Sequence, residues 1–520
     1  MTGARALKDG PLYGADSRWS WITAFSCCWV LFLALATPRV SGIFFYGIVE
    51  TFMVSREDAS WAVSLAGALM ALAGPIAGDL CERFSCRAVL LTCSSLAGIG
   101  AGLCYLAEDL LFIAISFGVV HGCALCGLYV AANVLLAQHF EKRRATACSL
   151  VYTACGLNTI VIPPLVEFFR TTYGVRGAFL LYGAVMLHAI PSVIILRSPV
   201  WLTKPKREPQ KGKYEAVNDQ TNAMCVLIHQ TDEDANTAKL HQDNSGLQDQ
   251  CSSCVHSATA SFKSQQKEST AFQLQSKKSA KELERKKFLG RLECGSTARQ
   301  FLSFTFLIHG LSFATVIFTT NIFCIIPADL ARDKGMDPSN SVYVLQAFSV
   351  TDVAFRAVVG LAIDSRTLSL ESVMLLGFAL QGLAFEWLVW AGTLSPLIAA
   401  AALLGSAGGS RMCLQAPAMV RDFGISTLPM MMGGLSFCAG ASLLIRPLLI
   451  GYFRDTHGDY TGLLHLMAAV NAFFVCIWSV KLFTRRRTIS RLRSKSAAIR
   501  KRCMTDLPAS LTENSCRGEY

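Results

Sequence analysis

Three ionisable residues interrupt long apolar stretches of this 520-residue sequence: Arg39, Asp352 and Arg356. A charged side chain at the centre of a bilayer costs at least about 2.5–3.5 kcal/mol, so a residue of this kind is a functional candidate by default. If these stretches cross a membrane, we expect the three residues to form a site for a charged solute or a proton.

Asp352 and Arg356 are four residues apart, which places both on one face of a helix with the acid nearer the N-terminus. That order favours an ion pair. One interpretation is a structural salt bridge in which two polar groups share their burial. The other is transport chemistry: protonation of Asp352 frees the Arg356 guanidinium to hold a carboxylate in bidentate fashion. Arginine keeps its own proton, so the proton must reside on the acid.

Arg39 would add a second fixed cation. Other polar or aromatic residues in apolar runs are candidates for a substrate cavity. They are Arg411, Arg446, Phe355 and Asn158. The two arginines have an alternative, in which the side chain extends along the helix until its head reaches water. Weaker candidates, which packing or an internal hydrogen bond would also explain, are Glu386, His121, His188, His309, Tyr129 and Asn133.

The composition indicates where these residues lie. The chain is 52% hydrophobic and 16% charged, whereas soluble domains carry about 25% charged residues. About twenty apolar residues cross a bilayer as a helix, and the sequence contains twelve runs of that kind. Their approximate spans are 20–48, 59–80, 87–107, 110–137, 145–168, 175–197, 301–326, 340–363, 370–393, 396–420, 427–453 and 461–484. We therefore predict an all-α membrane protein with twelve transmembrane helices in two six-helix bundles.

The predicted domains follow from these runs. They are a tail (1–19), an N-terminal bundle (20–197), a loop (198–300), a C-terminal bundle (301–484) and a basic tail (485–520). The loop is rich in Gln, Ser, Lys and Thr, so we predict that it is disordered, with a short helix near Lys277–Leu292.

The net charge of +12 is concentrated in the tails and loops rather than in the apolar runs. Nine Lys and Arg residues lie between Arg485 and Arg502, and the loop begins and ends with basic clusters. By the positive-inside rule, the loop and both termini are predicted to be cytoplasmic. This pattern favours anionic lipid over nucleic acid as the partner of the basic segments.

The sequence does not indicate an enzyme. Nucleophile triads, nucleotide-binding loops and metal-ligand spacings are absent from it, and the pair Cys251 and Cys254 has no second pair at zinc spacing. We therefore expect no cofactor and no metal.

Similar turns follow the second and eighth runs. Gly78–Arg87 and Gly360–Arg366 each contain a glycine, then an acid, then an arginine. The first resembles the loop signature of the major facilitator superfamily, which is built from parallel six-helix repeats. The resemblance implies a latch between the two halves, although a basic turn obeying the positive-inside rule is the alternative. The latch candidates are Asp79, Glu82, Arg83, Asp364 and Arg366.

Two further motifs resemble the monocarboxylate transporter family of that superfamily. Residues 16–21 keep the acid and both tryptophans of its first-helix motif but not the glycines, and residues 140–149 resemble its Phe-x-Lys-Arg-Arg-x-x-Ala-x-Gly signature with Ser149 in place of the last glycine. The motif residues are Asp16, Trp19, Trp21, Lys142, Arg143 and Arg144. Asp352 and Arg356 match the family's helix 8 couple, whereas Arg39 stands where proton-linked members have lysine.

The resemblance implies a plasma-membrane carrier of small monocarboxylates such as lactate or pyruvate, coupled to protons and working by alternating access. Because arginine cannot release a proton as lysine can, Arg39 also leaves open a facilitative carrier of a bulkier or zwitterionic substrate, of the aromatic amino acid, thyroid hormone or creatine type. A third interpretation is a membrane sensor that binds solute without carrying it. A single-span glycoprotein partner is a further implication of the resemblance.

Overall fold

The structure is a computed structural model that describes residues 14–199, 201, 300–336 and 341–505. The chain divides into two units, residues 1–199 with 300–520 and residues 200–299. Apart from Trp201, the second unit lies outside the described residues, and so do the predicted disordered loop, its short helix and the Cys251–Cys254 pair.

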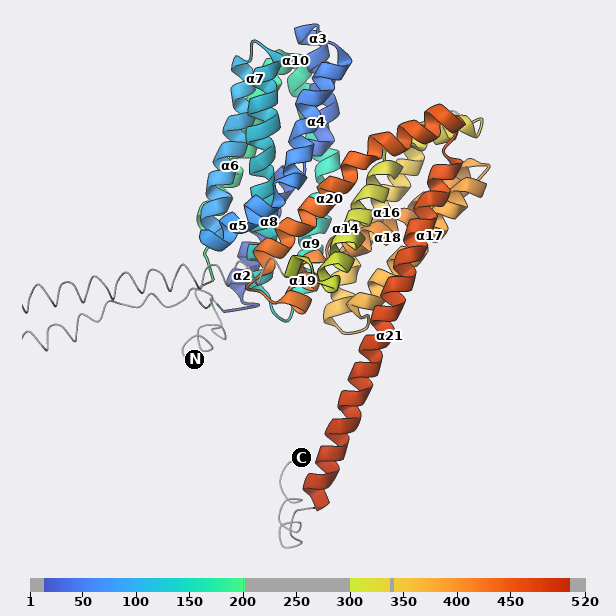
Figure 1. Ribbon diagram of the computed structural model, residues 1–520. Helices are drawn as coiled ribbons and strands as arrows, with labels where there is room; N and C mark the ends of the chain where they lie inside the picture. The colour runs from blue at the N-terminus through green and yellow to red at the C-terminus, as the bar shows by residue number, and fades with distance from the viewer. Residues whose placement is uncertain (1–13, 200, 202–299, 337–340, 506–520) are drawn as a thin grey trace, which may run out of the picture. The chain divides into compact units, whose positions relative to one another are not determined.

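The first half of the larger unit consists of helices joined by short turns (Figure 1). Its elements are α2 (Arg18–Ala34), α3 (Thr37–Phe52), α4 (Arg56–Leu72), α5 (Gly74–Arg83), α6 (Cys86–Leu103), η1 (Cys104–Leu106), α7 (Leu110–Ile113), η2 (Ala114–His121), α8 (Gly122–His139), α9 (Arg144–Gly156), α10 (Asn158–Leu187) and α11 (Ala189–Ile195).

The second half repeats this all-helical pattern. Its elements are α14 (Phe304–Phe323), α15 (Pro327–Asp333), α16 (Ser341–Asp364), α17 (Leu370–Trp390), α18 (Leu394–Met412), α19 (Gln415–Phe423), α20 (Leu428–Gly451), η4 (Tyr452–His457) and α21 (Thr461–Thr505).

The described helices account for the twelve predicted crossings. Nine segments are long and apolar enough to span a membrane, and two bent helix pairs bring the total to eleven. One of the nine, Arg144–Ile195, has 52 residues, which at about 1.5 Å per residue is more than twice the thickness of the hydrocarbon core. Gly174 breaks this segment with φ 71° and ψ 177°, so it supplies two crossings. The prediction of a twelve-helix fold is confirmed.

An even number of crossings brings Arg18 and Thr488 to the same side, which we call the A side. The turns at 84–85, 140–143, 365–369 and 424–427 lie on that side too, because each follows an even-numbered crossing.

Several crossings are less regular than the sequence predicts. The second and tenth bend by 49° and 40°, at Pro75 and just before Pro417, because proline removes a backbone donor and clashes with the preceding turn. The last helix, α21, continues from the crossing to Thr505 (Figure 1). The predicted tail at 485–520 therefore begins as helix, since residues 485–505 contain no glycine or proline to end it.

The two halves meet through backbone contacts at glycines. A Cβ atom added to Gly74 of α5 would lie 2.1 Å from the carbonyl oxygen of Gly433 in α20, and one added to Gly433 would lie 2.2 Å from that of Gly74. A Cβ on Gly360 of α16 would lie 2.4 Å from the oxygen of Ala145 in α9. These positions lie toward the A side, so the halves are closed against each other there.

Candidate functional site

Asp352 and Arg356 form an ion pair on one face of α16. Arg356 Nη2 lies 2.6 Å from Asp352 Oδ2, and each side chain is 12% exposed. Arg356 Nη1 also donates to the carbonyl oxygen of Tyr152 in α9, at 3.4 Å. Its Nε has no partner within the described part of the chain. The pair therefore lies where the second half contacts the first, with part of its hydrogen-bonding capacity unused.

Glycines of α18 set the position of this pair. A Cβ atom on Gly409 would lie 2.2 Å from the backbone oxygen of Asp352 and 2.9 Å from its Oδ1. One on Gly405 would lie 2.2 Å from the oxygen of Phe348, one turn earlier. Small residues of this kind let helix backbones approach closely. Helix α18 thus forms the wall behind Asp352.

Arg39 comes from the other half of the protein. It is the third residue of α3 and is exposed. Of the three residues predicted from the sequence, the structure brings Asp352 and Arg356 into direct contact, and Arg39 places a further positive charge in the first half.

Tyr152 is a member of this region that sequence reasoning missed. Its hydroxyl donates to Asn133 Oδ1 at 3.0 Å and lies 3.3 Å from the Tyr129 hydroxyl, both in α8, while its carbonyl accepts from Arg356. Asn133 and Tyr129 therefore make internal polar contacts between α8 and α9, which is the packing alternative named for them in the sequence analysis. The sequence carries no signal for Tyr152, because its role depends on how α9 is rotated against α8 and α16.

The other cavity candidates fall in different places. Arg411 is fully buried. Its Nε donates to the Ala407 oxygen at 2.9 Å, and its Nη2 donates to Gln381 Oε1. The guanidinium carbon Cζ lies 4.3 Å from the centre of the Phe378 ring. The alternative in which Arg411 reaches water is therefore wrong. Asn158 is buried and donates to the Phe32 oxygen at 3.2 Å, which ties α10 to α2. Phe355 is half-exposed beside Arg356, and Arg446 is partly buried in α20.

The weaker candidates are engaged elsewhere. His121 is buried between Thr37 Oγ1 and the Ala97 oxygen, at 3.0 and 2.7 Å. His188 is exposed and bonds the Ala184 oxygen of its own helix. Glu386 pairs with His465 at 2.9 Å on the surface.

Asp364 connects the two halves directly. Its Oδ2 accepts from the backbone N–H of Thr146 at 2.8 Å and from the Thr146 hydroxyl at 2.7 Å. Thr146 lies in the first turn of α9, so Asp364 caps a helix of the opposite half, where an anion is favoured. Of the other latch candidates, Asp79 and Arg83 pair with each other at 2.7 Å within α5, and Glu82 and Arg366 are exposed. Arg366 has a left-handed backbone with φ 61°.

The family motifs dock onto each other. Asp16 accepts backbone N–H groups from Glu141, Lys142 and Arg143 at 3.2, 2.8 and 3.0 Å. The Trp21 ring packs edge-on against Phe140, with ring centres 5.0 Å apart. The acid of the first motif thus anchors the second motif.

Two more motif residues, Trp19 and Arg144, complete this unit. The Arg197 guanidinium lies 4.9 Å from the centre of the Trp19 ring, and Arg144 Nε donates to the Ala137 oxygen at 2.9 Å. Together with the Asp16 contacts, they hold the A-side ends of α2, α8 and α9 together. We infer that these motif residues act by maintaining this junction, since the contacts described above lie within it.

Asp16→Ala is expected to reduce stability by about 1.5–3 kcal/mol, because three backbone donors lose a charged acceptor. Thermal unfolding of the purified protein in detergent measures the effect. Asp109→Ala, which removes an exposed acid that makes no side-chain cap on α7, is the matched control. An equal change in both variants would contradict the anchoring role.

Comparisons with known proteins agree with this architecture. Residues 24–318 match the family described as the Major Facilitator Superfamily. The chain belongs to the major facilitator superfamily. The fold also resembles that of a solved Escherichia coli fucose:proton symporter, with a TM-score of 0.61 at 13% identity over 89% of this chain and 99% of that one. At that identity the likeness concerns the fold.

Curated relatives confirm the resemblance to monocarboxylate transporters. The chain is 28% identical over 208 residues to monocarboxylate transporter 6 of Mus musculus, and 29% identical over 209 residues to monocarboxylate transporter 11 of Homo sapiens. These matches span 40% of this chain and 43% and 44% of those relatives. The superfamily and these relatives indicate a multi-pass membrane transporter rather than an enzyme.

Proposed function

We propose that this protein carries small monocarboxylates of the lactate or pyruvate type across the plasma membrane together with a proton. The observation that carries the proposal is the Asp352–Arg356 ion pair in a membrane-spanning helix, at the contact between the two halves. An ion pair that served structure alone could be replaced by apolar residues at little cost. A titratable acid beside a permanent cation instead suits the joint binding of a proton and an anion.

The contacts of Arg356 suggest the loading step. With Asp352 ionised, its Oδ2 occupies Nη2 of the guanidinium. Protonation of Asp352 removes that charge, and the planar guanidinium can then bind both oxygens of a carboxylate. One proton and one anion enter together, so the loaded site gains no net charge. Arg39 attracts the anion and stays positive throughout.

Alternating access gives the cycle its direction. In this structure the halves touch at Gly74 and Gly433 and through Asp364 and Thr146, all toward the A side. Loading would therefore occur from the opposite side, and release on the A side would require these contacts to break. We propose that the A side is cytoplasmic, because the basic segments belong inside. A single-span glycoprotein partner stays a prediction of the resemblance.

A facilitative carrier of a bulkier or zwitterionic substrate is the second candidate. The observation that favours it is Arg39, which cannot pass on a proton as lysine can. In this case Asp352 would remain ionised and could bind the ammonium group of a zwitterion.

An uptake panel at two pH values separates the two candidates. The protein is expressed in cells that lack endogenous carboxylate uptake, and labelled lactate, pyruvate, creatine and an aromatic amino acid are offered at external pH 6 and pH 7.5. The proposal predicts faster lactate or pyruvate uptake at pH 6. Uptake that does not change with pH would remove the symport and favour the second candidate.

Arg356→Lys is expected to raise the apparent KM for the carboxylate about tenfold, because a point charge cannot replace the planar guanidinium. Concentration-dependent uptake, corrected for surface expression, measures this. Arg332→Lys, an exposed arginine in α15, is the control for the type of substitution. An unchanged KM in Arg356→Lys would contradict direct binding of the substrate by this residue.

A further inference from the structure

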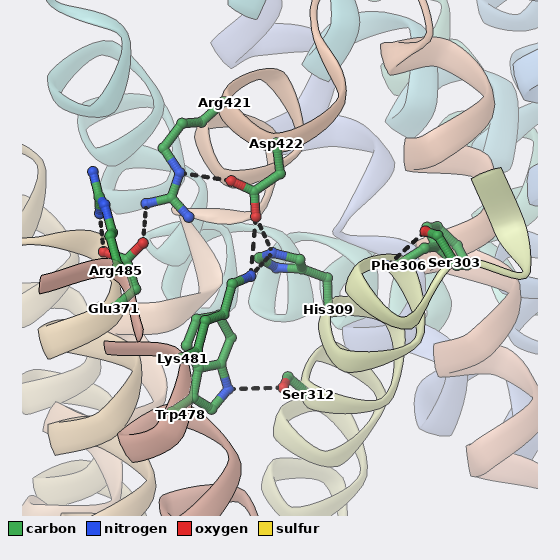
Figure 2. Close-up of polar contacts among 10 residues, drawn as sticks. All are labelled: Ser303, Phe306, His309, Ser312, Glu371, Arg421, Asp422, Trp478, Lys481 and Arg485. Atoms are coloured by element: carbon green, nitrogen blue, oxygen red, sulfur yellow. Dashed lines mark hydrogen bonds and ion pairs between the residues drawn. The ribbon is translucent and has the colours of Figure 1, made fainter. Parts of the chain in front are cut away.

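A second group of charged residues gathers near the A-side ends of helices in the second half, and Figure 2 shows their contacts. We call it the His309 cluster. Its members come from α14, α17, α19 and α21, and they are His309, Glu371, Arg421, Asp422, Lys481 and Arg485. The loading step proposed above uses none of them.

Three atoms at the centre of the cluster form a triangle. His309 Nε2 lies 2.8 Å from Asp422 Oδ2, Lys481 Nζ lies 2.9 Å from His309 Nε2, and Lys481 Nζ lies 3.0 Å from Asp422 Oδ2. The His309 side chain is almost completely buried, whereas those of Asp422 and Lys481 retain some exposure. Protons can therefore reach the imidazole past its two partners.

A second layer holds this triangle in place. Arg421 bridges two carboxylates, with Nε 2.8 Å from Asp422 Oδ1 and Nη1 2.7 Å from Glu371 Oε1. Arg485 pairs with the other oxygen of Glu371. Two acids thus face three cations, and the imidazole is the remaining member, with the side-chain type whose ordinary pKa lies closest to neutral pH.

Among the residues that the structure describes, the other helices packed against this part of α14 add no further charge to the surroundings of His309. From α20, Cys438 faces the adjacent Gly310. From α18, Arg411 is linked through Gln381 to Thr319 of α14, ten residues and about 15 Å further along the helix. The charged groups that bear on His309 are therefore Asp422, Lys481 and, behind them, Arg421.

The triangle cannot keep all its contacts in one protonation state. When Nε2 carries no proton, the Lys481 ammonium donates to both Nε2 and Asp422 Oδ2. When Nε2 binds a proton it donates to Asp422 instead, and an imidazolium then faces an ammonium at 2.9 Å. Like charges at that distance repel. Proton binding therefore breaks the Lys481–His309 hydrogen bond and forms a hydrogen bond from His309 Nε2–H to Asp422.

We propose that the His309 cluster is a proton-binding site, separate from Asp352, which controls the Lys481–His309 hydrogen bond between α21 and α14. Proton binding releases Lys481 of α21 and tightens α14 onto α19. Helix α19 contacts α8 and α9 of the other half, so the site lies where it can influence closure of the A side. The site itself does not depend on the proposed substrate. Its effect on carriage rests on the proposed function.

Trp478 provides an internal reporter. The centre of its ring lies 4.8 Å from Lys481 Nζ and 5.4 Å from the centre of the His309 ring. Its indole N–H donates to Ser312 at 3.0 Å (Figure 2). An imidazolium in contact with an indole quenches its fluorescence. The Trp478 signal, taken as the difference between the unaltered protein and Trp478→Phe, should therefore fall as the pH is lowered from 8 to 5.

The titration is done on the purified full chain without substrate, so its outcome is independent of transport. His309→Gln should abolish the pH-dependent change, and His188→Gln, which alters an exposed histidine, should retain it. Lys481→Met should raise the midpoint by about one pH unit, because a repelling cation is removed, and Asp422→Asn should lower it by a similar amount.

The two shifts of opposite sign keep the test valid even if His309→Gln does not fold. A flat Trp478 signal between pH 8 and 5, or shifts of the same sign in Lys481→Met and Asp422→Asn, would overturn the proposal. Neither result would bear on carboxylate carriage by Asp352 and Arg356.

Discussion

Asp352→Asn is expected to reduce proton-driven carboxylate accumulation at least tenfold while sparing exchange. An amide can neither take up nor release the proton. It also carries no negative charge, so Arg356 is left without a neutralising partner in the empty carrier, which is unfavourable. Leaving one partner of a buried pair alone costs about 3–5 kcal/mol. The loaded state is less affected, because asparagine resembles a protonated acid and the substrate neutralises Arg356. Net accumulation and exchange of labelled for unlabelled lactate are compared in the same vesicles.

Asp109→Asn, in an exposed turn before α7, serves as the control for this substitution. The decisive result is a loss of net accumulation without a loss of exchange. Accumulation at the level of the unaltered protein would show that Asp352 does not carry the coupled proton. Equal loss of both modes would point to a structural salt bridge instead.

Gly433→Ala is expected to lower the population of the A-side-closed state about tenfold. The added Cβ would lie 2.2 Å from the Gly74 oxygen, and this backbone cannot yield as a flexible side chain would. Overpacking of this kind costs about 1–3 kcal/mol, and about 1.4 kcal/mol is a factor of ten in a population. The cost falls only on the state in which α5 and α20 touch.

Crosslinking reports that population. Thr146 and Asp364, which bond across the halves, are both replaced by cysteine, and the rate of disulfide formation is followed by mass spectrometry. Gly67→Ala is the matched control, because a Cβ there would meet nothing within 4 Å. A crosslinking rate in Gly433→Ala equal to that in Gly67→Ala would contradict the role of the glycine contact in closure.

The fold could be predicted from the sequence because membrane crossings leave a direct signal in composition. Each crossing needs about twenty apolar residues, and the predicted runs correspond to the described helices. The breaks at Pro75 and Pro417 and the continuation of α21 to Thr505 were not predicted. Proline is tolerated in some membrane helices and bends others, and what decides is the neighbouring helix.

The pairing of Asp352 with Arg356 could also be predicted, because an i,i+4 spacing on one helix fixes the geometry. The environment of the pair could not. Tyr152 and Gly409 reach it from α9 and α18, and nothing in their local sequence indicates how those helices are rotated. Arg411 shows the same limit: an arginine in an apolar run suggested a cavity or water, and the structure closes it against Gln381.

The His309 cluster was missed for a related reason. Asp422, Lys481 and Glu371 lie near the ends of apolar runs, where charged residues are ordinary boundary markers. Only the assembly of four helices brings them to one histidine. Asp16 is an intermediate case. The family motif identified it, but its role in holding residues 141–143 became visible only in the fold.

The central claim is that Asp352 and Arg356 bind a proton and a carboxylate together, and uphill transport tests it most directly. The purified protein is reconstituted into vesicles with equal labelled lactate inside and outside, and a pH gradient is then imposed with the membrane potential clamped at zero. The account predicts that lactate accumulates on the alkaline side and that Asp352→Asn prevents this. Lactate that stays at equal concentration across the gradient in the unaltered protein would contradict the account.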